Sequence, residues 1–302
     1  MKSTDIAVIK YYIFSFILLV SGATKLAAQG FVSQSDIRFA EYLVDSRSWN
    51  DARFFLNQLT EKNYEEFAQD VYWLQGWNDY QAGWQRRSTL ALEKVGESHP
   101  NFLKSQFYLN YQRAWLSHNT QDSALLMTAQ NSLSQLQTST SLENELRLIL
   151  LGGFSLMEQD FDQYDEIREQ WAGSFPQLRP HQNQLNELEQ LLRNRPQKSP
   201  AFAAFLSAIL PGSGKWYAGK KGEAIAAFLQ VGIPAGITLE SYLKSNSLDA
   251  RTIVAGSFTA LFYTANIYGS YWTVRTANND INDALNNQIL FEIHIPVRTV
   301  FP

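Results

Sequence analysis

The chain has 302 residues, long enough for two domains, and its formal net charge is −4 at pH 7. A nucleic-acid-binding protein would present a basic surface, so this charge gives no reason to expect nucleic acid as a partner. The sequence contains no cysteine, which excludes disulfides, thiol catalysis, cysteine metal sites and the cysteine-linked anchor of bacterial lipoproteins. Any attachment to a membrane must therefore come from the chain itself.

Residues 1–28 show the order of a secretory signal. Lys2 and Lys10 precede a short apolar core, and small residues follow it up to Ala27 and Ala28. An apolar core of about ten residues is too short to span a bilayer of about 30 Å. We predict cleavage after Ala28, with an uncleaved anchor as the alternative. In either case the residues that follow leave the cytoplasm.

Apolar residues recur every three or four positions across 31–195, which is the period of a helix. One stretch resembles a tetratricopeptide repeat, a helix hairpin of about 34 residues. Its first copy is carried by Phe39, Ala40, Leu43, Trp49, Ala52, Phe55, Leu56 and Leu59. Ser88, Ala124 and Tyr164 stand where Ala52 does in three further copies, although Tyr164 replaces a small residue. The resemblance implies a helix-hairpin solenoid, and the alternative is an irregular helical bundle.

Such arrays present concave, aromatic-rich surfaces to extended peptides or partner helices. Six aromatic residues of the predicted helices are candidates for binding a protein partner: Trp73, Trp77, Tyr80, Tyr108, Tyr111 and Trp115. Aromatic residues at helical spacing also form cores, so packing inside the array is the alternative for each of them.

A basic, proline-containing linker at 196–200 precedes an apolar region, 201–279. The region holds three uncharged runs, at 201–210, 224–239 and 252–274. By length the last run suffices for a transmembrane helix, the middle one barely does, and the first does not. We therefore predict a transmembrane helical hairpin in a lipid bilayer, with a buried soluble hairpin as the alternative.

The first two runs are separated by a glycine-rich, basic turn. Its residues are Pro211, Gly212, Gly214, Lys215, Trp216, Tyr217, Gly219, Lys220 and Lys221. The glycines permit a tight reversal, the lysines suit a membrane face with anionic lipid, and the aromatic rings suit headgroup depth. The pattern Pro-Gly-x-Gly-x-x-Tyr-x-Gly resembles a small two-pass membrane domain found in many bacterial envelope proteins. That resemblance implies membrane residence and supplies no activity.

Small residues predict how the two membrane helices pack. Gly256, Ala260 and Thr264 recur every four residues, so they share one face of a helix. In lipid, small residues allow close approach of a second helix. We expect the mate to be the face that carries Gly232 and Gly236.

No set of residues in the sequence predicts a reaction. Gly212-Ser213-Gly214-Lys215 looks like part of a phosphate-binding loop, but Ile209 replaces its first glycine and Trp216 follows the lysine, so no nucleotide is expected. The four histidines share no metal-ligand spacing. The acidic residues after Asp160 lack a calcium loop and indicate the solvated start of a helix. We therefore expect no catalytic residues, cofactor or metal.

The period changes in the C-terminal residues, 286–302. Phe291, Ile293, Ile295 and Val297 alternate with polar or proline residues, which predicts an extended, strand-like tail. A lone strand is unstable, so it must pair with a partner sheet or pack on the protein's own surface.

Together these observations predict an all-α chain: a tetratricopeptide-like solenoid, a transmembrane helical hairpin and a short β-like tail. The expected function is a non-enzymatic membrane-anchored protein of the bacterial envelope, whose periplasmic repeats bind a protein partner while the hairpin sits in the inner membrane. The alternative is a membrane-active component whose apolar segment senses or moves lipid, or assists a membrane complex, under control of the repeats. If all three apolar runs cross, the 211–221 turn is cytoplasmic; if the first re-enters, the tail changes sides.

Overall fold

The computed structural model describes residues 31–62, 64–245 and 249–302, so the predicted signal at 1–28 lies outside the described residues. The elements of the described residues are helices, and the predicted all-α class is confirmed. They are α2 (Gln34–Asp45), α3 (Trp49–Thr60), the short 3-10 helix η1 (Glu65–Phe67), α4 (Ala68–Gln81), α5 (Gln85–Leu92), α6 (Phe102–Thr120), α7 (Ser123–Gln135), α8 (Ser141–Glu158), α9 (Phe161–Arg168), α10 (Arg179–Asn194), α11 (Pro200–Ile209), α12 (Ser213–Tyr217), α13 (Lys221–Ser245) and α14 (Ala250–Val300).

The chain divides into two compact units whose limits differ from the predicted domains. The first unit runs to His181 and also includes Ile293–Pro302, and the second is Gln182–Glu292. The last ten residues therefore belong with the helical pairs of the first unit, although the whole sequence of the second unit separates them.

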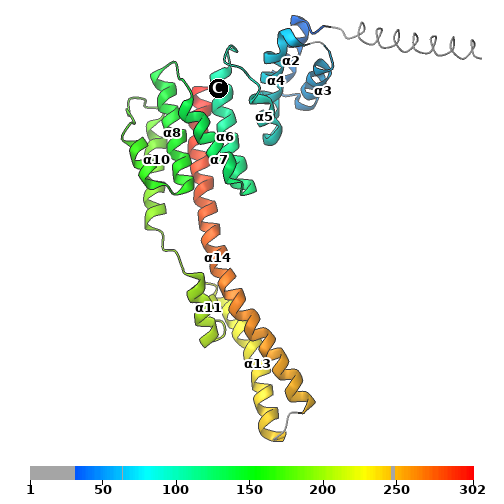
Figure 1. Ribbon diagram of the computed structural model, residues 1–302, viewed down its shortest axis with the longest axis vertical. Coiled ribbons are helices and arrows are strands. Elements are labelled where there is room, and N and C mark those ends of the chain that lie inside the picture. Colours follow the sequence, from blue (N-terminus) through cyan, green and yellow to red (C-terminus); the bar gives the residue numbers. More distant parts are fainter. Residues whose placement is uncertain (1–30, 63, 246–248) are drawn as a thin grey trace, which may run out of the picture. The chain divides into compact units, whose positions relative to one another are not determined.

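In the first unit, each helix packs against the next along the chain, from α2 to α9 (Figure 1). The second helix of each pair buries its fourth residue, and these residues are Ala52, Ser88, Leu126 and Tyr164. Three of the four are the positions that the sequence aligned. In α7 the predicted residue, Ala124, is exposed, and Leu126 takes the buried place two positions later. The predicted alignment of the third helix pair, α6 and α7, is therefore wrong by two residues.

Glycine allows α4 and α5 to approach closely. A Cβ atom added to Gly76 would lie 2.5 Å from Cδ2 of Leu92. The hydroxyl of Ser88 on α5 donates a hydrogen bond to the Gly76 carbonyl oxygen at 2.7 Å. Both residues at this contact between α4 and α5 are therefore small. Gly152 on α8 occupies a looser position, because an added Cβ would lie 3.4 Å from the rings of Tyr164 and Trp171.

Side-chain caps explain where several helices begin. Ser33 and Asp36 form a reciprocal capping box at the start of α2, and Thr140 and Glu143 do the same for α8. The carboxylate of Asp160 accepts a hydrogen bond from the Gln163 amide at 3.0 Å, and α9 starts at the next residue. The predicted helix start at Asp160 is confirmed.

The predicted extended tail is wrong, because α14 continues to Val300. The buried residues of this stretch are Ile289, Leu290, Ile293, Pro296 and Val297, whose spacing of three and four places them on one helical face. Phe291, which the alternating pattern placed with the apolar set, is 60% exposed. A helix also satisfies its own backbone hydrogen bonds, which a lone strand does not.

The second unit contains the apolar helices. One helix of the described residues is long and apolar enough to cross a bilayer, over Lys221–Lys244, and α11 is a shorter apolar helix. The run 252–274 is helical, within α14, but it does not meet the same criterion although we expected it to. Its tyrosines, threonines and Asn266 lower its apolar character.

Candidate functional site

Most of the predicted partner-binding aromatic residues form one cluster. From α4 come Trp73, Trp77 and Tyr80, whose successive rings stack with centroids 5.4 and 5.3 Å apart. From α6 comes Tyr108, whose ring lies 5.1 Å from Trp77 and 4.6 Å from Tyr80. We call these four residues, with Tyr111, the aromatic cluster. Trp115, the sixth predicted residue, is half-buried and makes no ring contact with them among the described contacts.

The C-terminal segment of the chain covers this cluster. The His294 ring stacks on Tyr111 with centroids 4.1 Å apart and planes 4° apart, and its Nε2 lies 2.6 Å from the Tyr80 hydroxyl. The Tyr108 hydroxyl donates to the Phe301 carbonyl oxygen at 2.9 Å. In Figure 1 this segment, in red, lies beside α6. The chain thus supplies its own occupant for the aromatic surface.

A lysine closes the end of the same contact. Lys104 on α6 places its ammonium 4.0 Å from the Trp77 ring centroid and donates a hydrogen bond to the Pro302 carbonyl oxygen. Burial lowers the pKa of Lys104. The terminal residues are therefore held by a charge-assisted bond in addition to ring contacts.

Burial shifts the acid–base properties of the cluster. It lowers the pKa of His294 to about 4, and the positive charge of Arg298 acts in the same direction. Burial also raises the pKa of Tyr80 to about 12, and that of Tyr111 further. At neutral pH the imidazole is uncharged and carries a single N–H, and its tautomer sets whether the Tyr80 hydroxyl or Nε2 is the donor. The cluster is a neutral, packed contact, with Trp73, Tyr108 and Tyr111 less than a tenth exposed. These aromatic residues therefore pack inside the protein, which was the alternative to binding a partner.

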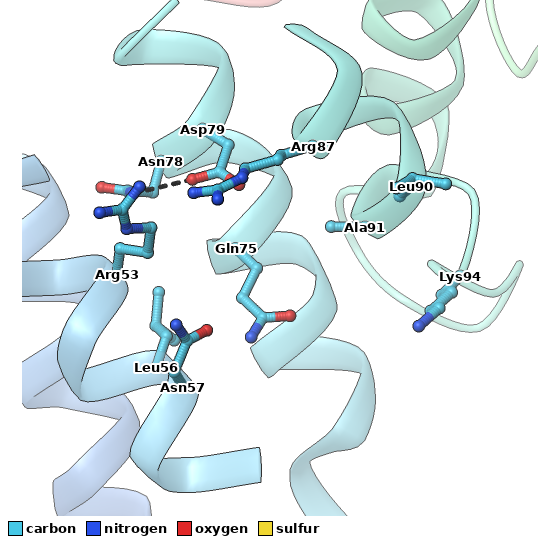
Figure 2. A pocket seen from close by; sticks show the side chains of 10 residues that line it. All are labelled: Arg53, Leu56, Asn57, Gln75, Asn78, Asp79, Arg87, Leu90, Ala91 and Lys94. Carbon is cyan, nitrogen blue, oxygen red and sulfur yellow. Dashed lines mark hydrogen bonds between the residues drawn. The ribbon is translucent and has the colours of Figure 1, made fainter. Parts of the chain in front are cut away.

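A second feature of the first unit is a polar cavity of about 240 Å³ between α3, α4 and α5. Figure 2 shows its lining: Arg53, Leu56, Asn57, Gln75, Asn78, Asp79, Arg87, Leu90, Ala91 and Lys94. We call it the basic cavity. Sequence reasoning missed it. The available signal was the spacing of Arg87, Leu90 and Ala91, which places them on one face of α5, with Lys94 in the turn that follows the helix.

Asp79 is the carboxylate of the basic cavity. Asn78 Nδ2 donates to Asp79 Oδ1 at 3.3 Å and to the Trp49 carbonyl oxygen at 3.2 Å. Figure 2 shows the guanidinium groups of Arg53 and Arg87 reaching towards Asp79 from α3 and α5. Burial raises the pKa of Asp79, whereas the bond from Asn78 and the two arginine charges oppose that rise.

The glycine-rich turn of the second unit is packed against α14. Gly212, with φ of +86°, directs its amide to Asn266 Oδ1 at 3.2 Å. The Gly214 amide donates to Ser207 Oγ at 3.0 Å, and Ser207 Oγ donates to Ser270 Oγ at 2.7 Å. A Cβ at Gly214 would overlap the Ala203 carbonyl oxygen. A Cβ at Gly212 would likewise overlap the Ala224 carbonyl oxygen of α13, so the two glycines allow close packing of this turn on α11 and α13.

The basic and aromatic residues of the turn lie outside that packed core. Trp216 is 55% exposed, and the Lys221 ammonium lies 5.8 Å from its ring centroid. Tyr217 packs edge-on against Phe202 with centroids 5.4 Å apart. Lys220 is exposed, and Gly219 adopts a positive φ of +88° where the chain enters α13.

The predicted small-residue contact between α13 and α14 is not formed as expected. Gly232 and Gly236 are exposed, with nothing within 4 Å of an added Cβ, and Ala260 and Thr264 are also exposed. A Cβ added to Gly256 would lie 3.5 Å from Cγ2 of Thr238 on α13. The buried face of α14 is a neighbouring one, and it carries Thr252, Ala255, Asn266, Ser270 and Val274. Side-chain hydrogen bonds decide which face turns inward, because Asn266 and Ser270 are satisfied there.

No family model, curated protein sequence or solved structure matches the chain. Within the described residues, no group of three or more histidine, aspartate or glutamate side chains is arranged to hold a metal ion.

Proposed function

We propose that this chain is a non-enzymatic, membrane-anchored protein of the bacterial envelope. In this proposal α13 and the first part of α14 lie in the inner membrane, and the helical pairs of the first unit bind a protein partner in the periplasm. The observation that carries it is the exposure of apolar side chains around α13.

The exposed residues of α13 support a lipid environment. Over Lys221–Lys244, 17% of the apolar window is buried. Its exposed large apolar residues are Ile225, Phe228, Leu229, Ile233, Ile237, Leu239, Tyr242 and Leu243. They cover the faces of the helix other than the buried one that carries Ala224, Ala227 and Val231, as in a helix that faces lipid on most sides. In water such surface costs about 25 cal/mol per Å² relative to an apolar surrounding, and a bilayer removes that cost.

The first part of α14 adds to the same apolar surface. Ile253, Val254, Phe258 and Leu261 are more than half exposed there. Further along, Tyr268 and Trp272 are exposed, and the Arg275 guanidinium lies 4.8 Å from the Trp272 ring centroid. Aromatic rings beside a basic residue suit the level of lipid headgroups. This order supports a helix that leaves the bilayer near Trp272.

The surface for a protein partner is sought on α2 and α3, because the C-terminal segment covers the aromatic cluster. Phe39, Tyr42 and Phe54 are 47%, 64% and 66% exposed, and the rings of Phe39 and Tyr42 stack with centroids 6.4 Å apart. Exposed aromatic residues are enriched at the centres of protein interfaces. This group supports partner binding by the first unit.

The membrane proposal is tested by labelling single cysteines in a chain that has none of its own. Lys220→Cys and Lys244→Cys stand in exposed positions close to the two ends of α13. The C-terminal end of α14 packs on the first unit, so α14 must return to the periplasmic side, where α13 begins. We therefore expect an impermeant thiol reagent in intact cells to label Lys220→Cys and not Lys244→Cys. Asp51→Cys, exposed on α3, is the control for the periplasmic side. Labelling of both α13 positions from one side would contradict a spanning helix.

An apolar cavity favours a second candidate function, in which the membrane segment itself binds or moves lipid. The cavity measures about 300 Å³ and is lined by Leu210, Pro211, Trp216, Ile225, Phe228 and Leu229 among others. Replacing 200–279 by an unrelated transmembrane hairpin separates the two candidates. Retained function in cells supports the anchored binding protein, and lost function supports the lipid-active one.

A further inference from the structure

The basic cavity carries more positive than negative charge. Arg53, Arg87 and Lys94 line it together with one carboxylate, that of Asp79. In the part of the chain that the structure describes, none of the three cations forms an ion pair with a carboxylate. Among the lining residues the positive charges thus outnumber the single carboxylate, around a space of about 240 Å³.

Two of the cations are held in place by aromatic rings. The Arg53 guanidinium lies 4.2 Å from the Trp84 ring centroid, and the Lys94 ammonium lies 5.1 Å from that of Tyr72. A ring face attracts a cation without neutralising its charge. It also reduces the side-chain entropy lost when the cation binds a ligand. Arg53 and Lys94 are therefore restrained before any ligand enters, whereas Arg87 is an exposed side chain.

The remaining lining residues suit an anion with oxygen atoms. Guanidinium groups present a planar fork of donors that matches a carboxylate or a phosphate in two parallel hydrogen bonds. The amides of Asn57 and Gln75 line the same space and carry further N–H donors. In Figure 2 both side chains lie between α3 and α4, on the side of the cavity away from Asp79.

We propose that the basic cavity binds a carboxylate or phosphate group. Arg53 and Arg87 would donate hydrogen bonds to this group, and Lys94 would be the third cation beside it. The group is carried either by a small molecule or by an acidic segment of a protein. This site is separate from the exposed aromatic residues of α2 and from the apolar helices. Its test therefore does not depend on membrane attachment.

Calorimetric titration of the purified full-length chain tests the proposal with two probes, inorganic phosphate and a blocked hexapeptide that contains three glutamates. We expect at least one probe to bind, with affinity that falls as salt is raised. The double variant Arg53→Gln, Arg87→Gln should weaken binding about tenfold or more, because two charged hydrogen-bond donors are lost.

The neighbouring Arg86→Gln is the matched control, since Arg86 is exposed and does not line the cavity. It should leave affinity within about twofold. Tighter binding of the peptide than of phosphate assigns the site to a protein segment, and the reverse assigns it to a small anion. Should the double variant fail to fold by circular dichroism, the exposed Lys94→Gln replaces it, with an expected loss of about threefold. The proposal is overturned if neither probe binds the natural chain, or if Arg86→Gln weakens binding as much as the cavity variants.

Discussion

His294 and Tyr80 are 214 positions apart in sequence, yet Nε2 of the histidine lies 2.6 Å from the tyrosine hydroxyl. This contact, with the stacking of the same ring on Tyr111, joins the end of the chain to the second and third helical pairs. The last residues therefore belong to the first unit. They cover the aromatic residues that the sequence predicted to bind a protein partner.

The His294 contact should make the first unit sensitive to acid. The pKa of His294 is lowered from 6.5 to about 4, so folding favours the neutral imidazole ring. The contribution to the free energy of unfolding is then complete above about pH 6.5 and is lost as pH falls from about 6.5 to about 4. After allowance for solvent screening of the partly exposed ring, the loss should be on the order of 1–2 kcal/mol.

Urea denaturation of the natural chain and of His294→Asn, at pH 7 and pH 4.5, checks this expectation. The variant cannot titrate at this position, so its stability should change less between the two pH values. Equal changes in both proteins would assign the acid sensitivity to other groups.

Packing of the C-terminal segment should contribute strongly to stability. Ile293 is fully buried, and Ile293→Ala removes its apolar contacts and leaves a cavity. We expect a cost of about 2–5 kcal/mol in chemical denaturation. Phe291→Ala, two positions earlier and 60% exposed, is the control and should cost about 0.5 kcal/mol or less. Similar effects of the two variants would argue against the buried helical face and for the alternating pattern.

The close approach of α4 and α5 should not tolerate a methyl group at Gly76. The added Cβ would lie 2.5 Å from Leu92, so Gly76→Ala should destabilise the chain by about 1–3 kcal/mol. At Gly152 the nearest atoms are 3.4 Å away, and Gly152→Ala should cost less than about 1 kcal/mol. Thermal unfolding followed by circular dichroism compares them. A larger loss at Gly152 than at Gly76 would contradict the pairing.

The turn of the second unit should depend on Gly214. Its added Cβ would overlap the backbone oxygen of Ala203, which cannot move without shifting α11. We expect Gly214→Ala to cost about 3 kcal/mol and to increase cleavage of this segment in limited proteolysis. Gly222→Ala, with open space around it, should be neutral or stabilise α13 by about 0.5–1 kcal/mol. Equal protease resistance of both variants would mean that the turn is not packed against α11.

Local features were readable from the sequence because their causes are local. The helical period of 31–195, the cap at Asp160 and the buried positions of Ala52, Ser88 and Tyr164 all follow from side chains within a few residues. The gathering of Trp73, Trp77 and Tyr80 was also predictable, since residues three and four apart share a helix face.

The tertiary structure alone decided the rest. Residues 289–297 fit both an alternating strand and a helical stripe, and the partners that select the helix, Tyr80 and Tyr111, are about two hundred residues away. Arg53 and Arg87 likewise share a cavity only because α3, α4 and α5 pack together. Periodicity encodes which face of a segment is apolar. What that face meets depends on long-range packing, and here the chain's own end fills the surface that a partner was expected to use.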